Sequence, residues 1–160
     1  MASANLHPLQ EVALLRLVFL GRDEAAIPQV GQALENLAGV ANATGGLAEA
    51  LGDRLRALEI HRRQNEHTLL GYDFVNTADL LIRVGRHGEA VRLLDEIDAG
   101  AARGFDAYIR HARRATVLRA QSEAIQHRHA AARKYAAQVL PAPAGEPDTT
   151  ALLARAFTDY

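Results

Sequence analysis

Two short amphipathic segments that meet at a glycine-containing break constrain this chain most. They occupy residues 77–100, where apolar side chains recur at helical spacing on both sides of Gly85 and Gly88. The apolar positions before the break are Ala78, Leu81 and Ile82, and those after it are Ala90, Leu93, Leu94 and Ile97. Such spacing places the apolar residues on one face of a helix, and the glycines allow the chain to reverse. The stretch therefore predicts two helices joined by a tight turn.

Composition predicts that the rest of the chain is helical as well. Apolar residues make up 49% of the 160 residues, aromatic residues 5%, and tryptophan is absent. Alanine and leucine must therefore fill most of the core, which favours closely packed helices over a sheet. The sequence predicts an all-α fold with about seven to eight helices, at 9–20, 23–43 or 28–43, 47–65, 67–84, 89–99, 105–126, 129–140 and 149–157.

Three segments are predicted along the chain. Residues 1–140 form the helical domain, which is long enough to bury one core. Residues 141–147 contain three prolines and a glycine, so they are expected to form a linker without helical potential. Residues 148–160 form a C-terminal helix or tail, which Asp148 can cap.

Small residues recur with the spacing of the central unit. Ala78, Gly85 and Ala90 are matched upstream by Ala38, Gly45, Ala50 and Ala57, and downstream by Ala120 and Ala132. This pattern resembles the tetratricopeptide repeat family over about residues 32–141. The resemblance implies antiparallel helical hairpins stacked as a short solenoid, in which the small residues allow close packing. The units are 40 and 42 residues apart, longer than the standard of about 34, and His127 stands where a turn glycine is expected.

The resemblance also implies where a partner would bind. In this family the first helices of the hairpins line a concave face that commonly holds extended or helical peptides. By position, the partner-binding residues would be Gln32, Glu35, Asn42, Tyr72, Asp79, Arg83, Arg114 and Gln121. Their charges are mixed and lack the Lys/Asn pattern of a clamp for a C-terminal carboxylate. We expect a non-enzymatic protein–protein interaction module (an adaptor, chaperone or regulatory scaffold) that binds another protein or a peptide.

The sequence offers no catalytic, metal or cofactor motif. Cysteine is absent, and the seven histidines include no HExxH motif. His127 and His129 are two apart, so on one helix they would lie on different faces and would converge only at a turn. The glycine pairs match neither GxGxxG nor GxxxxGK, and only two serines occur. We therefore expect no enzyme, no metal and no cofactor.

A basic segment leaves three possible partners open. Residues 103–134 carry eight basic residues against Asp106 and Glu123, although the formal net charge is only −1. The segment could bind nucleic acid, an acidic protein, or the acidic residues of helix 89–99 (Glu89, Asp95, Glu96 and Asp98). Because few aromatic residues are interleaved, intramolecular pairing or an acidic protein is favoured over nucleic acid.

A further alternative for the function of the whole chain is a regulatory domain that senses a small apolar ligand, which a deep closed pocket would favour.

The opening helix, 9–20, is apolar on nearly all sides. An exposed helix normally keeps a polar face, so Leu14, Val18 and Phe19 are expected to be covered, with a homodimer interface as one alternative. Its apolar run is nine residues long and contains Arg16, too short and too polar to span a bilayer. We expect a soluble, cytoplasmic protein that does not bind membranes.

Overall fold

The computed structural model describes residues 30–139, and every regular element in that range is an α-helix. The helices are α2 (Val30–Ala43), α3 (Leu47–Gln64), α4 (His67–Arg83), α5 (His87–Ala102), α6 (Asp106–Ile125) and α7 (His129–Val139). The predicted all-α class is confirmed for these residues. The predicted helices 9–20 and 149–157, the linker 141–147 and the interface residues Leu14, Val18 and Phe19 lie outside the described range. Within residues 30–139, no helix combines the length and apolar character needed to cross a membrane.

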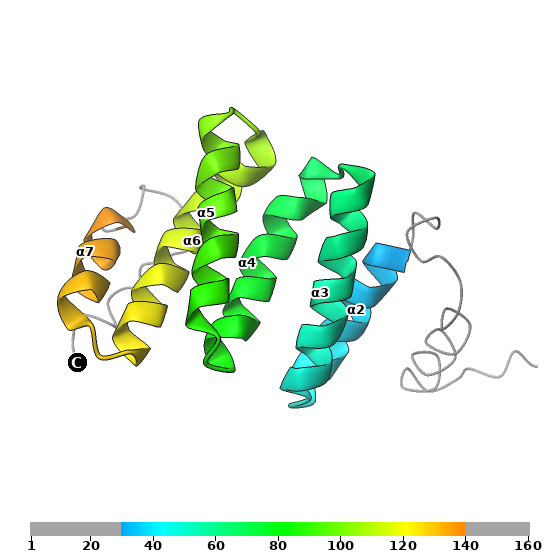
Figure 1. The fold of residues 1–160 in the computed structure, drawn as a ribbon, viewed down its shortest axis with the longest axis horizontal. Helices are drawn as coiled ribbons and strands as arrows, with labels where there is room; N and C mark the ends of the chain where they lie inside the picture. The colour runs from blue at the N-terminus through cyan, green and yellow to red at the C-terminus, as the bar shows by residue number, and fades with distance from the viewer. Residues whose placement is uncertain (1–29, 140–160) are drawn as a thin grey trace, which may run out of the picture.

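The helices lie side by side in sequence order, from α2 at one end to α7 at the other (Figure 1). Each helix packs against the next, and α4 also packs against α6. In Figure 1, α3 and α5 are nearer to the viewer than α2, α4 and α6. The described helices therefore form two layers, and α2, α4 and α6 share the layer on which the partner-binding residues were predicted.

The main core lies between α3, α4, α5 and α6. Its largest fully buried side chains are Phe74, Leu81, Ile82, Leu94 and Ile97. Burial of each such side chain contributes about 1.5–3 kcal/mol to the free energy of folding. Two smaller clusters lie at the ends, one between α2 and α3 and the other between α6 and α7.

Small residues stand where the helices approach closely. The alanines of the predicted repeat are at most 1% exposed: Ala38, Ala50, Ala78, Ala90, Ala120 and Ala132. Two glycines have the same role. A Cβ atom on Gly71 would lie 2.8 Å from the carbonyl oxygen of Ala107, and one on Gly100 would lie 2.5 Å from the ring of Tyr108. The approach of α4 and α5 to α6 therefore depends on the absence of a side chain at these two positions.

The turns that end α2, α4 and α6 share one backbone geometry. Gly45, Gly85 and His127 stand at equivalent positions and have φ angles of 87°, 80° and 57°. The amide of the following residue donates to the carbonyl five residues before it, at 2.8 Å, 2.8 Å and 2.9 Å. This is the hydrogen bond of a Schellman C-cap, in which glycine is the usual left-handed residue. His127 thus preserves the turn, although its side chain disfavours the conformation.

The sequence predicts an apolar stripe on helix 105–126 that includes Ile109 and Ile125, but both side chains are exposed. Ile109 is 51% exposed because its neighbour Tyr108 packs onto Gly100 of α5, and the next helical residue points about 100° further around the axis. Ile125 is 48% exposed, while Ser122 takes the buried side at that end of α6 and contacts His87 at 3.0 Å.

Candidate functional site on the α2, α4 and α6 layer

The structure distributes the predicted partner-binding residues over three helices with different exposure. Gln32, Tyr72, Arg83 and Arg114 are exposed, Asn42, Asp79 and Gln121 are half-buried, and Glu35 is buried. One pair among them meets across the layer, because Arg83 of α4 donates to the Asn42 side-chain oxygen of α2 at 2.6 Å. The other exposed members have no such contact with one another among the described residues.

Glu35 and Arg54 form a buried ion pair between α2 and α3, so neither side chain lies on a free surface. Their carboxylate and guanidinium atoms approach to 2.5 Å, as a close charge contact without the alignment of a hydrogen bond. The sequence leads us to expect Arg54 on the exposed side of helix 47–65, together with Arg62 and Arg63, and for Arg54 this expectation is wrong. Arg54 is three residues from Leu51 and four from Leu58, both buried, so the helical period places it inward. The Glu35 carboxylate compensates its charge there.

His61 and Asp73 form a second buried pair beside the first. The imidazole Nδ1 lies 2.6 Å from an Asp73 carboxyl oxygen, and both side chains are 1% exposed. The other face of the imidazole lies against α2, where a Cβ atom on Gly31 would be 2.2 Å from Nε2. Gly31 therefore makes the space that the His61 ring occupies. Together, Glu35, Arg54, His61 and Asp73 form a buried polar cluster that joins α2, α3 and α4.

Burial decides the charges in this cluster. It raises the pKa of Asp73 to about 9, with the neighbouring Glu35 carboxylate as the second cause. Burial also lowers the pKa of His61 from its ordinary value, so the imidazole is neutral. We assign a neutral pair joined by one hydrogen bond between Nδ1 of His61 and a carboxyl oxygen of protonated Asp73, in which the imidazole tautomer sets the donor. The neutral pair of His61 and Asp73 thus lies beside the ion pair of Glu35 and Arg54.

Tyr72 lies at the surface directly above this cluster. Its ring is 42% exposed, and the Arg54 guanidinium carbon lies 5.5 Å from the ring centroid. On its other side, the ring centroid is 6.3 Å from that of His111 on α6. Contacts from two helices thus hold an exposed aromatic side chain in place. Such a residue can bury its ring against a partner with little further loss of conformational entropy.

Two arginines flank His111 on α6. Arg110 and Arg114 are exposed, and neither contacts a carboxylate within residues 30–139. Burial, followed by the charges of Arg114 and Arg110, holds the pKa of His111 below its usual value. Position in the repeat pattern predicts Arg114 at the site but does not predict Arg110 or His111. Their i, i+3 and i, i+4 spacing around Arg114 was the available signal.

Three other cations of the basic segment have partners inside the molecule. Arg119 is buried and contacts the carboxylates of Asp95 and Asp98 at 2.8 Å and 2.9 Å. Arg128 pairs with Glu123, and Arg113 donates to the Val139 carbonyl at 3.2 Å. The predicted pairing between the basic segment and the acidic fifth helix is confirmed at Arg119.

The histidines have separate surroundings. His67 stacks on Phe105 with ring centroids 4.7 Å apart, and His87 contacts Ser122. The turn does bring His127 and His129 together, with ring centroids 6.0 Å apart. Within residues 30–139, no three His, Asp or Glu side chains are arranged to hold a metal ion.

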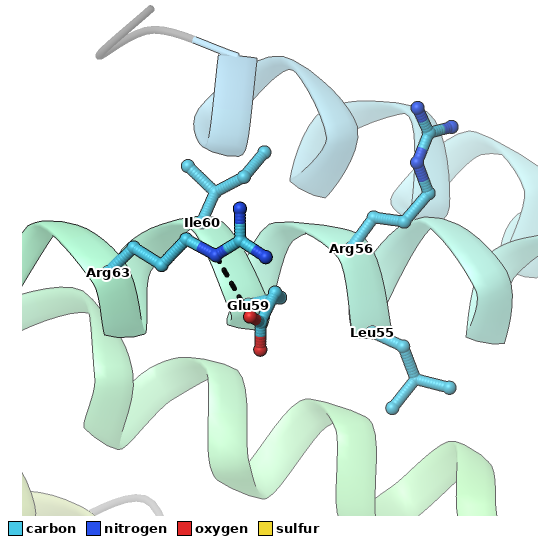
Figure 2. A pocket seen from close by; sticks show the side chains of 5 residues that line it. All are labelled: Leu55, Arg56, Glu59, Ile60 and Arg63. Atoms are coloured by element: carbon cyan, nitrogen blue, oxygen red, sulfur yellow. Dashed lines mark hydrogen bonds and ion pairs between the residues drawn. The ribbon is translucent and has the colours of Figure 1, made fainter. Parts of the chain in front are cut away.

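Two grooves are lined mainly by residues of α3 and α5, the helices of the other layer. One, of about 280 Å³, is lined by Leu55, Arg56, Glu59, Ile60 and Arg63 of α3 (Figure 2). Glu59 and Arg63 form an ion pair at 3.0 Å beside it. The second, of about 200 Å³, lies between α3 and α5 and includes Arg62, Arg92, Glu89 and Glu96 in its lining. Both are surface grooves with charged walls, unlike the closed apolar pocket that a small apolar ligand would favour.

In comparisons with known proteins, no family model, curated protein or solved structure matches this chain. A function for this chain is therefore inferred from the geometry of the site.

Proposed function

We propose that this chain is a short helical-repeat scaffold of stacked hairpins that binds a peptide segment of another protein on its α2, α4 and α6 layer. The role is non-enzymatic, because binding and positioning are what the side chains on this layer can provide. The observation that carries the proposal is Tyr72, an exposed aromatic ring held between Arg54 and His111. Tyrosine and arginine are among the residue types that most often dominate binding energy at protein interfaces.

The equivalence of the three units supports the scaffold. The same small residues are buried in each unit, and the three turns share one geometry. Stacked units of this kind present the first helix of each hairpin along one continuous surface. The bond between Arg83 and Asn42 joins two of these helices at that surface. A peptide lying across α4 and α6 would contact Tyr72 and Arg114.

Selection of a random peptide library on the purified full-length chain tests this proposal. We expect enriched peptides to bind saturably, and Tyr72→Ala to weaken them at least about tenfold, as is typical of a hot-spot aromatic residue. Arg114→Ala should weaken them as well. Arg92→Ala is the matched control, since Arg92 is an exposed arginine on α5 in the other layer.

Thermal unfolding of each variant separates loss of binding from loss of folding. Tyr72→Phe keeps the ring and should retain most of the affinity. If no peptide is enriched, or if Arg92→Ala reduces binding as much as Tyr72→Ala does, the proposal fails.

A further inference from the structure

We propose that the surface formed by Tyr72, Arg110, His111 and Arg114, here called the α4–α6 surface, binds an acidic peptide segment through its Asp and Glu carboxylates. The inference rests on the proposed function and narrows it to one seam of the layer and to one class of partner. The first argument is charge. Arg119 and Arg128 are neutralised by carboxylates of this chain, whereas Arg110 and Arg114 contact none within residues 30–139.

The arrangement of these cations is unfavourable without a partner. Arg110 and Arg114 are four residues apart on one helix, where like charges repel. His111 lies between them, half-buried, and its pKa is held down by burial and by both arginines. A carboxylate at this point would relieve the repulsion between the arginines and favour the protonated imidazole. No side chain within residues 30–139 supplies one, so the compensating charge is expected from a bound partner.

The geometry suits carboxylates. Arginine presents several donors in a plane that matches both oxygens of a carboxylate, and such charge-assisted bonds are stronger than neutral ones. The Tyr72 ring, which lies 6.3 Å from the His111 ring, can add apolar contact. The close seam between α4 and α6 at Gly71 and Ala107 fixes the distance between the aromatic and the cationic sides.

A protein segment fits this surface better than nucleic acid does. Single-stranded nucleic acid is commonly held by several aromatic platforms along a continuous basic groove. Here Tyr72 is the one large aromatic side chain among the strongly exposed apolar residues of the described range. The carboxylates of α5 also interrupt the basic segment at Arg119. The cationic area is therefore short, which suits a few carboxylates better than a run of phosphates.

The test compares three labelled probes on the full chain at physiological ionic strength. They are a peptide of alternating glutamate and glycine, its glutamine counterpart, and an oligothymidylate of equal charge. We expect saturable binding of the glutamate peptide, and at least about tenfold weaker binding by the other two. Arg110→Glu/Arg114→Glu should abolish it. Arg133→Glu/Lys134→Glu is the control, because it makes the same change in net charge at exposed residues of α7.

His111 reports directly on binding at the α4–α6 surface. In the complex, the pKa of His111, followed by its imidazole NMR signals, should rise, which a binding site elsewhere would not produce. Lack of saturable binding by the glutamate peptide, or equal loss in both double variants, would overturn the proposal. Tighter binding of the oligothymidylate would overturn it in favour of nucleic acid. If selected peptides bind through Tyr72 without any excess of acidic residues, peptide binding stands and the acidic inference alone fails.

Discussion

At the scale of single residues, the buried polar cluster is the least expected feature of this chain. Four ionisable side chains meet between α2, α3 and α4, and each is at most 9% exposed: Glu35, Arg54, His61 and Asp73. Removing one partner from such a group leaves an uncompensated polar atom, which is strongly destabilising. The cluster should therefore make the packing of α2 and α3 against α4 sensitive to substitution and to pH.

The protonation of Asp73 predicts a pH dependence of stability. Its pKa is raised to about 9 in the fold, so folding takes up a proton wherever the unfolded chain is ionised. The stabilisation is complete below the ordinary pKa of an aspartate and is lost as the pH rises toward 9. Between about pH 7 and pH 8.5, the free energy of unfolding of the parent should fall by up to about 1.4 kcal/mol per pH unit relative to Asp73→Asn.

Chemical denaturation of both proteins at several pH values measures this difference. His61 is retained in both, so its own titration largely cancels in the comparison. Parallel pH profiles would mean that Asp73 is ionised in the folded protein, and would contradict the neutral pair that we assign.

Gly31 and Gly39 provide a matched pair of glycines in α2. A Cβ atom at Gly31 would lie 2.2 Å from the buried ring of His61, whereas one at Gly39 meets nothing within 4 Å. Gly31→Ala should therefore cost about 1–3 kcal/mol by overpacking. Gly39→Ala should instead stabilise the helix by about 0.5–1 kcal/mol. Equal effects of the two substitutions in denaturant unfolding would show that His61 does not occupy this position.

At the scale of helices, burial of the repeated alanines sets the spacing. Ala90 is 0% exposed, so Ala90→Leu should push α5 away from its neighbours and cost about 1–3 kcal/mol. Ala99→Leu is the control, because Ala99 is exposed on the same helix. Alanine and leucine have similar helix propensities, so the exchange itself should change the stability little. A thermal melt in which Ala90→Leu is as stable as the parent would remove the main support for the repeat.

The turn at His127 offers a gain in stability. His127 has a φ of 57° at the position where Gly45 and Gly85 stand in the other hairpins. A non-glycine residue there costs roughly 1–2 kcal/mol, part of which glycine loses again through its greater unfolded-state entropy. His127→Gly should therefore raise the free energy of unfolding by about 0.5–1 kcal/mol, and the β-branched His127→Val should lower it. A loss of stability with glycine would contradict this account of the turn.

Helices and turns could be predicted from the sequence because their signals are local. Apolar spacing locates α3 to α7, and glycine marks two of the three equivalent turns. The polar cluster could not be predicted in the same way. Helical period alone places Arg54 inward, but its partner Glu35 lies on another helix and becomes its neighbour only when α2 and α3 pack. Asp73 and His61 likewise meet only through the packing of α3 and α4.

The candidate site was predictable only in part for a related reason. The resemblance to the repeat family selects Tyr72, Arg83 and Arg114 by position, and these are exposed, but it also selects Glu35, which is buried. Position within a repeat specifies the face of a helix, whereas burial depends on what the neighbouring hairpin brings to that face. Spacing on α6 places Arg110 and His111 beside Arg114, but their position next to Tyr72 depends on the close approach of α6 to α4 at Gly71, which no single-helix pattern reveals.

At the scale of the whole molecule, a formal net charge of −1 conceals an uneven surface. Ion pairs join α3 to α5 through Arg62 and Glu96, and α5 to α6 through Arg119, Asp95 and Asp98. These pairs occupy most of the acidic residues of α5, and Arg110 and Arg114 of α6 contact no carboxylate within residues 30–139. The described molecule therefore has one layer with internally paired charges beside its grooves and another with an anchored aromatic ring next to free arginines.

The measurement that tests this account most directly is an NMR titration of the isotope-labelled chain with a peptide selected from a random library. Amide shifts should be concentrated on α4 and α6, around Tyr72 and His111, and should saturate with one peptide per chain. The groove of α3 and α5, around Leu55 and Leu93, should remain unchanged and serves as the internal reference. Shifts concentrated in that groove, with α4 and α6 unaffected, would contradict the account.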